Sequence, residues 1–263
     1  MTSTYAPCSS AAAGLLVKGF WQTEGAPSYR VEYILPKGEV ELIFSFADAA
    51  GYERAGAGAG RTPRCFVNGL SDTPVQLLTP PHQSFFGVVL HPAAVRPLLG
   101  APAGVFLNGI TDLEGVNRSV SGVWEALAAC GSFAERVRYM EQWAGQRPPA
   151  LHRQERGISA FLSSGDEMST VRELAAHFCY SPRQLHRKVQ ELFGMAPEVL
   201  LRYKRYRQAL DRVHHSRETL TRVAYACGYY DQAHFNREFR DYTGLTPGAY
   251  RREQSHLPGH LFR

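Results

Sequence analysis

The sequence predicts an α+β N-terminal domain, β-rich with flanking helices, and an all-α C-terminal domain in which one helical unit occurs twice. Apolar and polar residues alternate over residues 31–46, as they do in strands with one buried face. In the second half of the chain apolar residues instead recur at helical spacing, and the segment 173–197 resembles the segment 222–247. We therefore expect one domain over residues 1–147 and another over residues 150–263.

The N-terminal elements follow from local patterns. The segment "VEYILPKGEVELIFSF" (31–46) predicts a β-hairpin around a Pro-Lys-Gly turn, and "AGAGAGRTP" (55–63) predicts a flexible loop. Further strands are expected at "RCFVNGL", "PVQLLTP" and "SFFGVVL", which are residues 64–70, 74–80 and 84–90.

Helices are expected after these strands. The segment "PAAVRPLLG" (92–100) predicts a short helix that begins at proline and ends at glycine. Residues 119–144 predict two helices that are broken at Gly131-Ser132. The segment "GQRPPA" (145–150) predicts a linker between the domains, because two prolines after a glycine cannot continue a helix.

Composition is that of a soluble globular protein, with 263 residues of which 44% are hydrophobic and 20% are charged. No run of 18 apolar residues occurs and the first residues lack the layout of a secretory signal, so a cytoplasmic location is expected. Of the 29 Lys and Arg, 18 lie in residues 151–263 with 12 of the 24 Asp and Glu, so this part carries +6 and the rest −1. This excess is expected if the C-terminal domain alone meets a polyanion, although a charged, solvated surface explains it as well.

The sequence offers little for catalysis or metal binding. The five cysteines are scattered and form no CxxC, which favours reduced, mostly buried thiols. His82 and His91 have no second strong donor at metal-ligand spacing, and His214-His215 is interpreted as structural. No Ser/His/Asp arrangement, phosphate-binding glycine loop or paired carboxylates are found. We therefore expect no enzyme activity, no cofactor and no metal.

The repeat in the second half is a duplicated helix-turn-helix. Five residues of the first copy align with five of the second at an offset of 50, which are Leu185, Arg187, Val189, Gly194 and Pro197 against Phe235, Arg237, Phe239, Gly244 and Pro247. The first helices align at 49, so the second turn is one residue longer.

Each copy has the signals of a capped amphipathic helix. Ser181 and Asp231 are N-cap residue types, and Pro182 stands at the favoured first helical position. The predicted buried stripe consists of Leu185, Val189 and Leu192 in one copy and Phe235, Phe239 and Tyr242 in the other. The outward faces carry Arg183, His186 and Arg187, and Ala233, Asn236 and Arg237.

These residues resemble the AraC/XylS family of bacterial transcription regulators over about residues 170–252. The resemblance rests on "LAAHFCYSPRQLHRKVQELFG", "PEVLLRYKRYRQAL" and "VAYACGYYDQAHFNREFRDYTGLTPGAYRR". It implies two helix-turn-helix units joined by a linker helix over about residues 197–212, each placing its second helix in the major groove. Cys179 departs from the pattern, because this turn position often holds glycine.

By the same resemblance, bases would be read by Arg183, His186 and Arg187 in the first copy and by Gln232, Asn236 and Arg237 in the second. The chemistry agrees, because Arg bonds guanine bidentately and Asn or Gln does so with adenine. Helix salt bridges are the alternative for Arg187 and Arg237. Phosphate contacts, or plain solvation, are expected for Ser181, Arg202, Lys204, Arg205, Arg251 and Arg252.

The N-terminal half more loosely resembles a sensor-like domain found fused to such DNA-binding domains. The candidate effector pocket comprises Trp21, Glu41, Phe44, Phe66, Phe86 and His91, for which ordinary core packing is the alternative. The predicted function is a sequence-specific transcription regulator that binds double-stranded DNA, a small-molecule effector and RNA polymerase, forms a homodimer and has no contact with membranes.

Two alternatives stay open at this point. One is a DNA-bridging protein whose N-terminal domain only dimerises. The other is a relative of DNA-repair methyltransferases, which would need a clustered cysteine metal site or a Pro-Cys-His motif that the sequence lacks.

Overall fold

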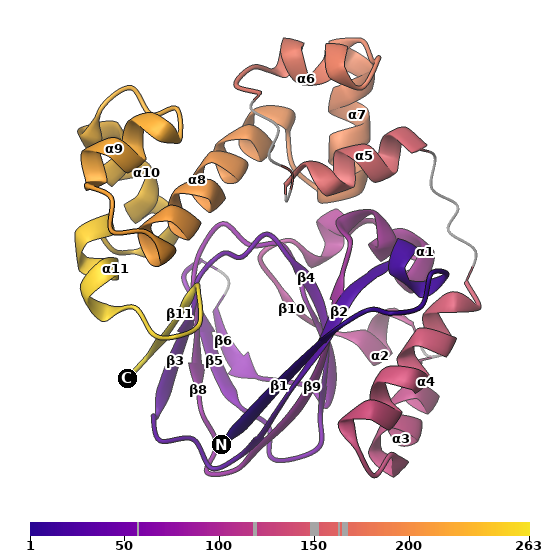
Figure 1. The fold of residues 1–263 in the computed structure, drawn as a ribbon. Coiled ribbons are helices and arrows are strands. Elements are labelled where there is room, and N and C mark those ends of the chain that lie inside the picture. The colour runs from indigo at the N-terminus through magenta and orange to yellow at the C-terminus, as the bar shows by residue number, and fades with distance from the viewer. Residues whose placement is uncertain (57, 118–119, 148–152, 163, 165–167) are drawn as a thin grey trace.

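The computed structural model describes residues 1–56, 58–117, 120–147, 153–162, 164 and 168–263. Two antiparallel sheets face each other in the N-terminal part, and helices follow (Figure 1). The first sheet has the order β1 (Thr2–Pro7), β2 (Val17–Gly25), β9 (Gln83–Leu90), β4 (Val40–Ser45), β7 (Cys65–Asn68), β10 (Ile110–Asp112). The second has the order β11 (His260–Phe262), β3 (Val31–Ile34), β8 (Val75–Leu78), β5 (Gly51–Arg54), β6 (Gly58–Arg61).

The expected hairpin over residues 31–46 is wrong, although both of its strands form. Strand β3 pairs with β8 and β11, whereas β4 pairs with β7 and β9 in the other sheet. The alternating pattern marks a strand with a buried face but does not specify its partner. The Pro-Lys-Gly segment therefore carries the chain from one sheet to the other, with Gly38 at a φ of 71°.

The glycine-rich segment 55–63 also differs from the expected loop. It contains the strand β6, which pairs with β5 so that Gly60 lies opposite Tyr52. The absence of a side chain at Gly60 leaves room for this tyrosine side chain, which a Cβ at Gly60 would approach to 3.0 Å. The other three expected strands are confirmed as β7, β8 and β9.

Short helices connect these strands, and two longer helices flank the first sheet (Figure 1). They are η1 (Ala13–Leu15), η2 (Pro92–Ala94), α1 (Val95–Leu99), η3 (Ala103–Phe106), α2 (Leu113–Val116), α3 (Ser121–Ala129) and α4 (Phe133–Gly145). The predicted break at Gly131-Ser132 is confirmed, because the hydroxyl of Ser132 caps α4 by accepting from the amide of Glu135. The ring of Phe133 meets that of Phe86 at 6.1 Å, so the sheet buries its outer face against α4.

The C-terminal part is helical, as predicted. Its helices are α5 (Arg153–Phe161), α6 (Val171–His177), α7 (Pro182–Phe193), α8 (Pro197–His215), α9 (Leu220–Ala226), α10 (Gln232–Thr243) and α11 (Pro247–Glu253). The predicted stripe residues of α7 and α10 are all buried. The linker helix is α8, and it joins the two helix-turn-helix units (Figure 1). The Pro-Pro-Ala part of the expected linker, residues 148–150, lies outside the described residues.

The two parts of the chain share one hydrophobic core. The hydroxyl of Tyr203 in α8 accepts a hydrogen bond of 2.8 Å from the amide of Gly38, and that of Ser159 in α5 accepts one of 3.0 Å from the amide of Ala93. The last strand, β11, pairs with β3 in the second sheet. The end of the chain therefore lies in the N-terminal part, on the far side of the predicted domain boundary.

The turns of the two units are alike in spite of Cys179. Cys179 has a φ of 57° and Gly228, at the aligned position, a φ of 75°. Their amides bond the carbonyl oxygens of Ala176 and Tyr225, and the next amides bond those of Ala175 and Ala224. The first turn therefore reaches the same geometry with a side chain in the left-handed region, which costs about 1–2 kcal/mol for a residue other than glycine.

A matched pair of variants in these two turns should change the free energy of unfolding in opposite directions. Gly228→Ala should lower the free energy of unfolding by about 1–2 kcal/mol, because a Cβ at Gly228 meets no atom within 4 Å and only the backbone conformation is penalised. Cys179→Gly should raise it by a smaller amount, since glycine loses more backbone entropy on folding. Urea unfolding of the full chain measures both. An unchanged midpoint for Gly228→Ala would contradict the assignment of strain to this turn.

Candidate nucleic-acid interface and interior cavity

Helix α7 presents the first set of predicted base-reading residues. Ser181 and Gln184 form a reciprocal cap, in which each side chain accepts a hydrogen bond from the other residue's amide at 3.3 and 2.9 Å. Arg183, His186 and Arg187 are all exposed on this helix. The structure therefore places these three side chains on one accessible helix.

Helix α10 presents the second set. The carboxylate of Asp231 caps it by accepting a hydrogen bond of 2.7 Å from the amide of His234. Gln232 and Arg237 are exposed and Asn236 is half-buried. The side-chain oxygen of Gln232 accepts a hydrogen bond of 2.8 Å from Thr221 of α9, so this amide is held against the neighbouring helix.

An ion pair lies behind each of these helices. Lys188 of α7 bonds Glu155 of α5 at 2.7 Å, and Arg205 of α8 bonds Glu238 of α10 through two contacts of 3.0 and 2.7 Å. Burial opposes the charge of Arg205, but the hydrogen bond to Glu238 raises the pKa of Arg205 above its ordinary value. Each pair holds the second helix of a unit against the helix that precedes that unit, so α7 is fixed to α5 and α10 is fixed to α8.

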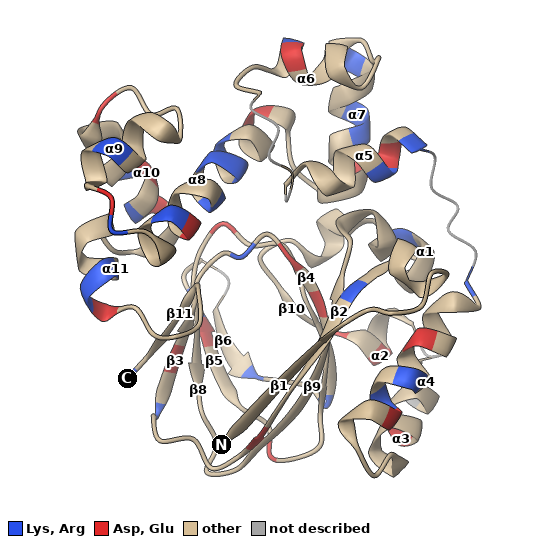
Figure 2. Ribbon diagram, viewed as in Figure 1, with Lys and Arg blue, Asp and Glu red and all other residues tan. Residues whose placement is uncertain are grey.

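The predicted phosphate-binding residues fall into two groups. Ser181, Arg202 and Arg252 are exposed. Lys204 is only 3% exposed and donates to the carbonyl oxygens of Phe161 and Ser164 at 2.6 and 3.0 Å. Arg205 is engaged by Glu238, and Arg251 donates to the carbonyl oxygen of Glu218 at 2.8 Å. Lysines and arginines are spread along α5, α7, α8 and α11 (Figure 2).

A cavity of about 1110 Å³ lies between the two sheets. Of the six predicted pocket residues, Trp21, Glu41 and Phe66 line it. Phe44 and Phe86 belong to the core on the other side of the first sheet, because successive residues of a strand point to opposite faces. His91 stands at the start of η2, where burial lowers the pKa of its imidazole.

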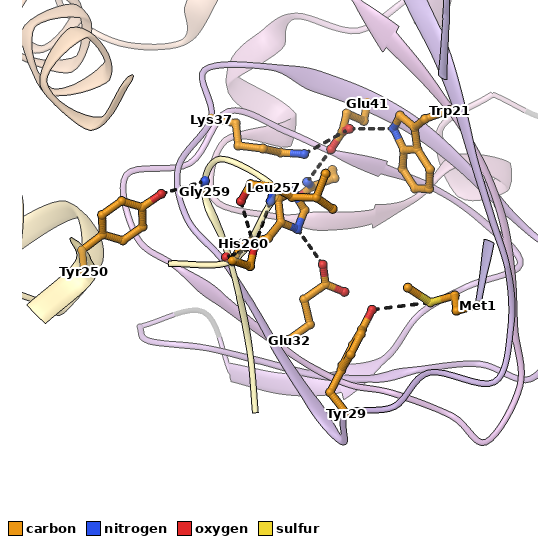
Figure 3. A network of polar contacts seen from close by, with 12 residues as sticks. Met1, Trp21, Tyr29, Glu32, Lys37, Glu41, Tyr250, Leu257, Gly259 and His260 are labelled. Carbon is orange, nitrogen blue, oxygen red and sulfur yellow. Dashed lines mark hydrogen bonds and ion pairs between the residues drawn. The ribbon is translucent and has the colours of Figure 1, made fainter. Parts of the chain in front are cut away.

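A polar network centred on Glu41 lies in the cavity wall (Figure 3). The indole nitrogen of Trp21 and the ammonium of Lys37 donate to one carboxylate oxygen at 2.9 and 3.4 Å, and the amide of Asn68 donates to the other at 3.3 Å. Burial alone would raise the pKa of Glu41, but Lys37 and these donors hold it below its ordinary value. Gly87 makes the arrangement possible, since a Cβ there would lie 2.0 Å from the Trp21 ring.

The end of the chain completes the cavity wall, which sequence reasoning missed. His256, Leu257, His260, Phe262 and Arg263 all line the cavity. The Nδ1 of His260 and a carboxylate oxygen of Glu32 lie 2.6 Å apart. A strand of three residues shows too little alternation to be detected in the sequence.

The comparisons with known proteins bear on the helical part first. Residues 174–253 match a family described as a helix-turn-helix domain. In this region the chain is similar to regulators of the AraC/XylS family. The transcriptional activator RhaS of Klebsiella pneumoniae (strain 342) is 38% identical over 68 residues, which cover 26% of this chain and 24% of RhaS. RhaS of Pectobacterium carotovorum is 34% identical over 80 residues, which cover 30% of this chain and 29% of that protein.

The remaining comparisons concern the N-terminal part and the overall arrangement of the chain. Residues 4–112, which include strands β2 to β10, match a family described as a domain of unknown function (DUF6597). Among solved structures, the C-terminal domain of AraT from Geobacillus stearothermophilus has a TM-score of 0.37 and 23% identity, covering 41% of this chain and 91% of that one. ToxT from Vibrio cholerae has a TM-score of 0.46 and 9% identity, covering 88% and 97%.

Among the residues that the structure describes, one group of three side chains lies close enough together to hold a metal ion. The ligand atoms of Cys65, Asp112 and Glu114 lie within 4.8 Å of one another. Arg64 already bonds Glu114 at 2.6 Å, and burial raises the pKa of Cys65 to about 12. A protonated thiol and a paired carboxylate are poor ligands, so this group gives little support to a metal site. No helix in the same described residues is long and apolar enough to cross a membrane.

The Glu41 network generates a prediction for stability against pH. Its folded pKa is lowered, so the ionised carboxylate stabilises the fold above the unfolded pKa of about 4.3, and this contribution is lost as pH falls below that value. Glu41→Gln should therefore cost about 1.5–3 kcal/mol at pH 7, and the difference from the wild type should shrink below about pH 4. Urea unfolding between pH 3.5 and 7.5 measures this. Glu53→Gln, at an exposed glutamate of β5, is the control, and a pH-independent difference for Glu41→Gln would contradict the prediction.

Proposed function

We propose that this protein is a sequence-specific DNA-binding transcription regulator whose N-terminal part binds a small-molecule effector. The observation that carries the proposal is the duplicated unit, in which two capped helices, α7 and α10, carry side chains suited to reading bases. Arg187 and Arg237 occupy aligned, exposed positions on these helices. A guanidinium there can bond guanine O6 and N7, and the amide of Asn236 can bond adenine N6 and N7.

Phosphate contacts complete the proposed interface. The exposed residues Arg202 and Arg252 and the N-terminal end of α7 at Ser181 are suited to them. Lys204, Arg205 and Arg251 are engaged within the protein, so we leave them out of the proposed contacts. Contacts with RNA polymerase and self-association stay predictions from the resemblance.

The cavity between the sheets is the proposed effector site. Its volume of about 1110 Å³ slightly exceeds the usual range of small-molecule pockets, which is about 300–1,000 Å³. Apolar side chains such as Ile43, Phe66 and Phe85 form much of its wall, and the Glu41 network adds a few polar groups. This combination is typical of a site that holds an apolar body and orients it by hydrogen bonds.

Selection of bound fragments from genomic DNA with the purified full chain tests the DNA-reading part. A regulator of this kind should enrich one asymmetric motif, because the two helices carry different side chains. A DNA-bridging protein without base reading would retain fragments in proportion to their length and enrich no motif.

Arg237 generates the first prediction for DNA binding. Arg237→Ala should weaken binding to the selected site by about 1–3 kcal/mol and relax the preference at one base pair, because a bidentate contact to guanine is lost. Fluorescence anisotropy with the selected site and its single-base variants measures this. Arg138→Ala removes an exposed charge of α4, which lies away from α7 and α10 (Figure 1), and is the control. An equal loss on every sequence would leave Arg237 only a phosphate contact.

The spacing of the two helices generates the second prediction for DNA binding. Helix α8 has 19 residues and is therefore about 28 Å long, which suits helices that enter successive major-groove segments about 10 to 10.5 base pairs apart. Inserting about 5 base pairs between the two parts of the site should reduce affinity toward the non-specific level, since one part turns to the opposite face of the duplex. Footprinting on spacer variants measures this. Unchanged affinity at the half-turn insertion would show that one unit alone reads DNA.

A further inference from the structure

The end of the chain is built into the N-terminal sheet. Strand β11 pairs with β3, with His260 opposite Ile34 and Phe262 opposite Glu32. The carbonyl oxygen of Arg263 accepts hydrogen bonds of 2.9 and 2.8 Å from the amides of Arg30 and Val31, and the amide of Arg263 donates to Val31 at 2.8 Å. Residues 254–263, which we call the tail, thus form an edge of the sheet that encloses the cavity.

Side chains of the tail alternate between the cavity and the core. His260 and Phe262 line the cavity, whereas Leu261 is 3% exposed and belongs to the core. The ring of Phe262 stacks on Tyr29 with centroids 4.4 Å apart, and His260 contacts Glu32. An occupant of the cavity would therefore touch the tail directly.

The tail is also bound to the second helix-turn-helix unit (Figure 3). The amide of Gly259 donates to the hydroxyl of Tyr250 in α11 at 3.2 Å, and the same hydroxyl lies 2.8 Å from Nδ1 of His214 at the end of α8. The ring of Tyr250 is fully buried and lies 5.8 Å from that of Phe239 in α10. Gly259 and Tyr250 therefore connect the wall of the cavity to the core beneath α10.

We propose that the tail is part of the effector site and reports its occupancy to the second helix-turn-helix unit. This rests on the proposed function, in which the cavity binds a small molecule. A ligand that packs on Phe262 binds the docked tail better than the detached one, so it shifts the population toward the docked state. Docking of the tail in turn holds Tyr250 and α11 against α8 and α10.

The cavity also indicates the chemistry of the ligand. Glu41 and Glu32 already have partners, and Arg263 pairs with Glu253. Gln83 lines the cavity, and its side-chain nitrogen is buried and has no hydrogen-bond partner among the described residues. These groups suit an uncharged, largely apolar molecule that offers one hydrogen-bond acceptor to Gln83.

The experiment uses the full chain and the uncharged fluorescent probe N-phenyl-1-naphthylamine, an apolar molecule that tests the cavity and the tail without the natural effector. Probe binding is followed by fluorescence, and hydrogen–deuterium exchange is measured by mass spectrometry over residues 247–263. In the wild type the bound probe should slow exchange in this segment by about 5-fold or more, the lower end of ordinary coupling between sites.

Two variants enlarge the cavity from different walls. Phe262→Ala removes the tail's ring and should weaken probe binding about tenfold and abolish the slowing of exchange. Leu77→Ala removes a cavity side chain of β8 and should keep the slowing of exchange at saturating probe. Phe262→Leu retains an apolar side chain on the tail and should restore most of the probe binding, which separates loss of the contact from loss of the fold.

The possible results separate a failure of the tail proposal from a failure of the proposed effector site. If the wild type binds the probe and exchange over residues 247–263 does not change, the tail is not a sensor, although the cavity remains a small-molecule site. The same holds if Phe262→Ala behaves like Leu77→Ala. If the wild type binds no probe, the cavity is not such a site and the tail proposal falls with it, while base reading by Arg237 is unaffected.

Discussion

The packing of two tyrosines on α8 determines where the rest of the helical part lies. Tyr206 stacks on Tyr242 of α10 with ring centroids 4.3 Å apart, and Tyr203 bonds the amide of Gly38 at the turn between the sheets. Helix α8 is thereby fixed both to α10 and to the N-terminal part. The hydroxyl of Tyr206 is buried and has no partner among the described residues, and burial of the whole ring together with its stacking offsets the cost of this unmade hydrogen bond.

The features that the sequence predicted correctly depend on neighbours within a few residues. Ser181 and Asp231 cap their helices as expected, and each cap needs only an amide three residues further along. The hairpin over residues 31–46 failed because strand partners are chosen by distant segments, and β11 is too short to give a pattern at all. Only three of the six candidate pocket residues line the cavity, for a related reason. Glu41 and Phe44 share one strand, but an odd separation turns them to opposite faces, which strand parity alone would have shown.

The charges of α8 show why composition cannot assign a phosphate-binding role. Lys204 and Arg205 are adjacent in a basic segment, yet Lys204 bonds backbone oxygens at and just after the end of α5, and Arg205 bonds Glu238. Burying a lysine costs free energy unless its donors are satisfied, and here three oxygens satisfy them. The basic residues that remain for the proposed contact with DNA are therefore those left exposed after these internal contacts are made. Which basic side chains stay exposed depends on how α5 and α10 pack against α8, and a count of charges in the sequence does not reveal this packing.

The two copies of the unit differ in a way that keeps them distinct. Lys188 and Glu238 occupy aligned positions, but one is basic and bonds Glu155 of α5, whereas the other is acidic and bonds Arg205 of α8. If α7 packed on α8 as α10 does, Lys188 would face Arg205, and two like charges would meet in a partly buried site. The reversed polarity therefore disfavours an exchange of partner helices between two otherwise similar units. Each second helix is thus assigned to one preceding helix, and the order of the two proposed DNA-reading faces along α8 follows from that assignment.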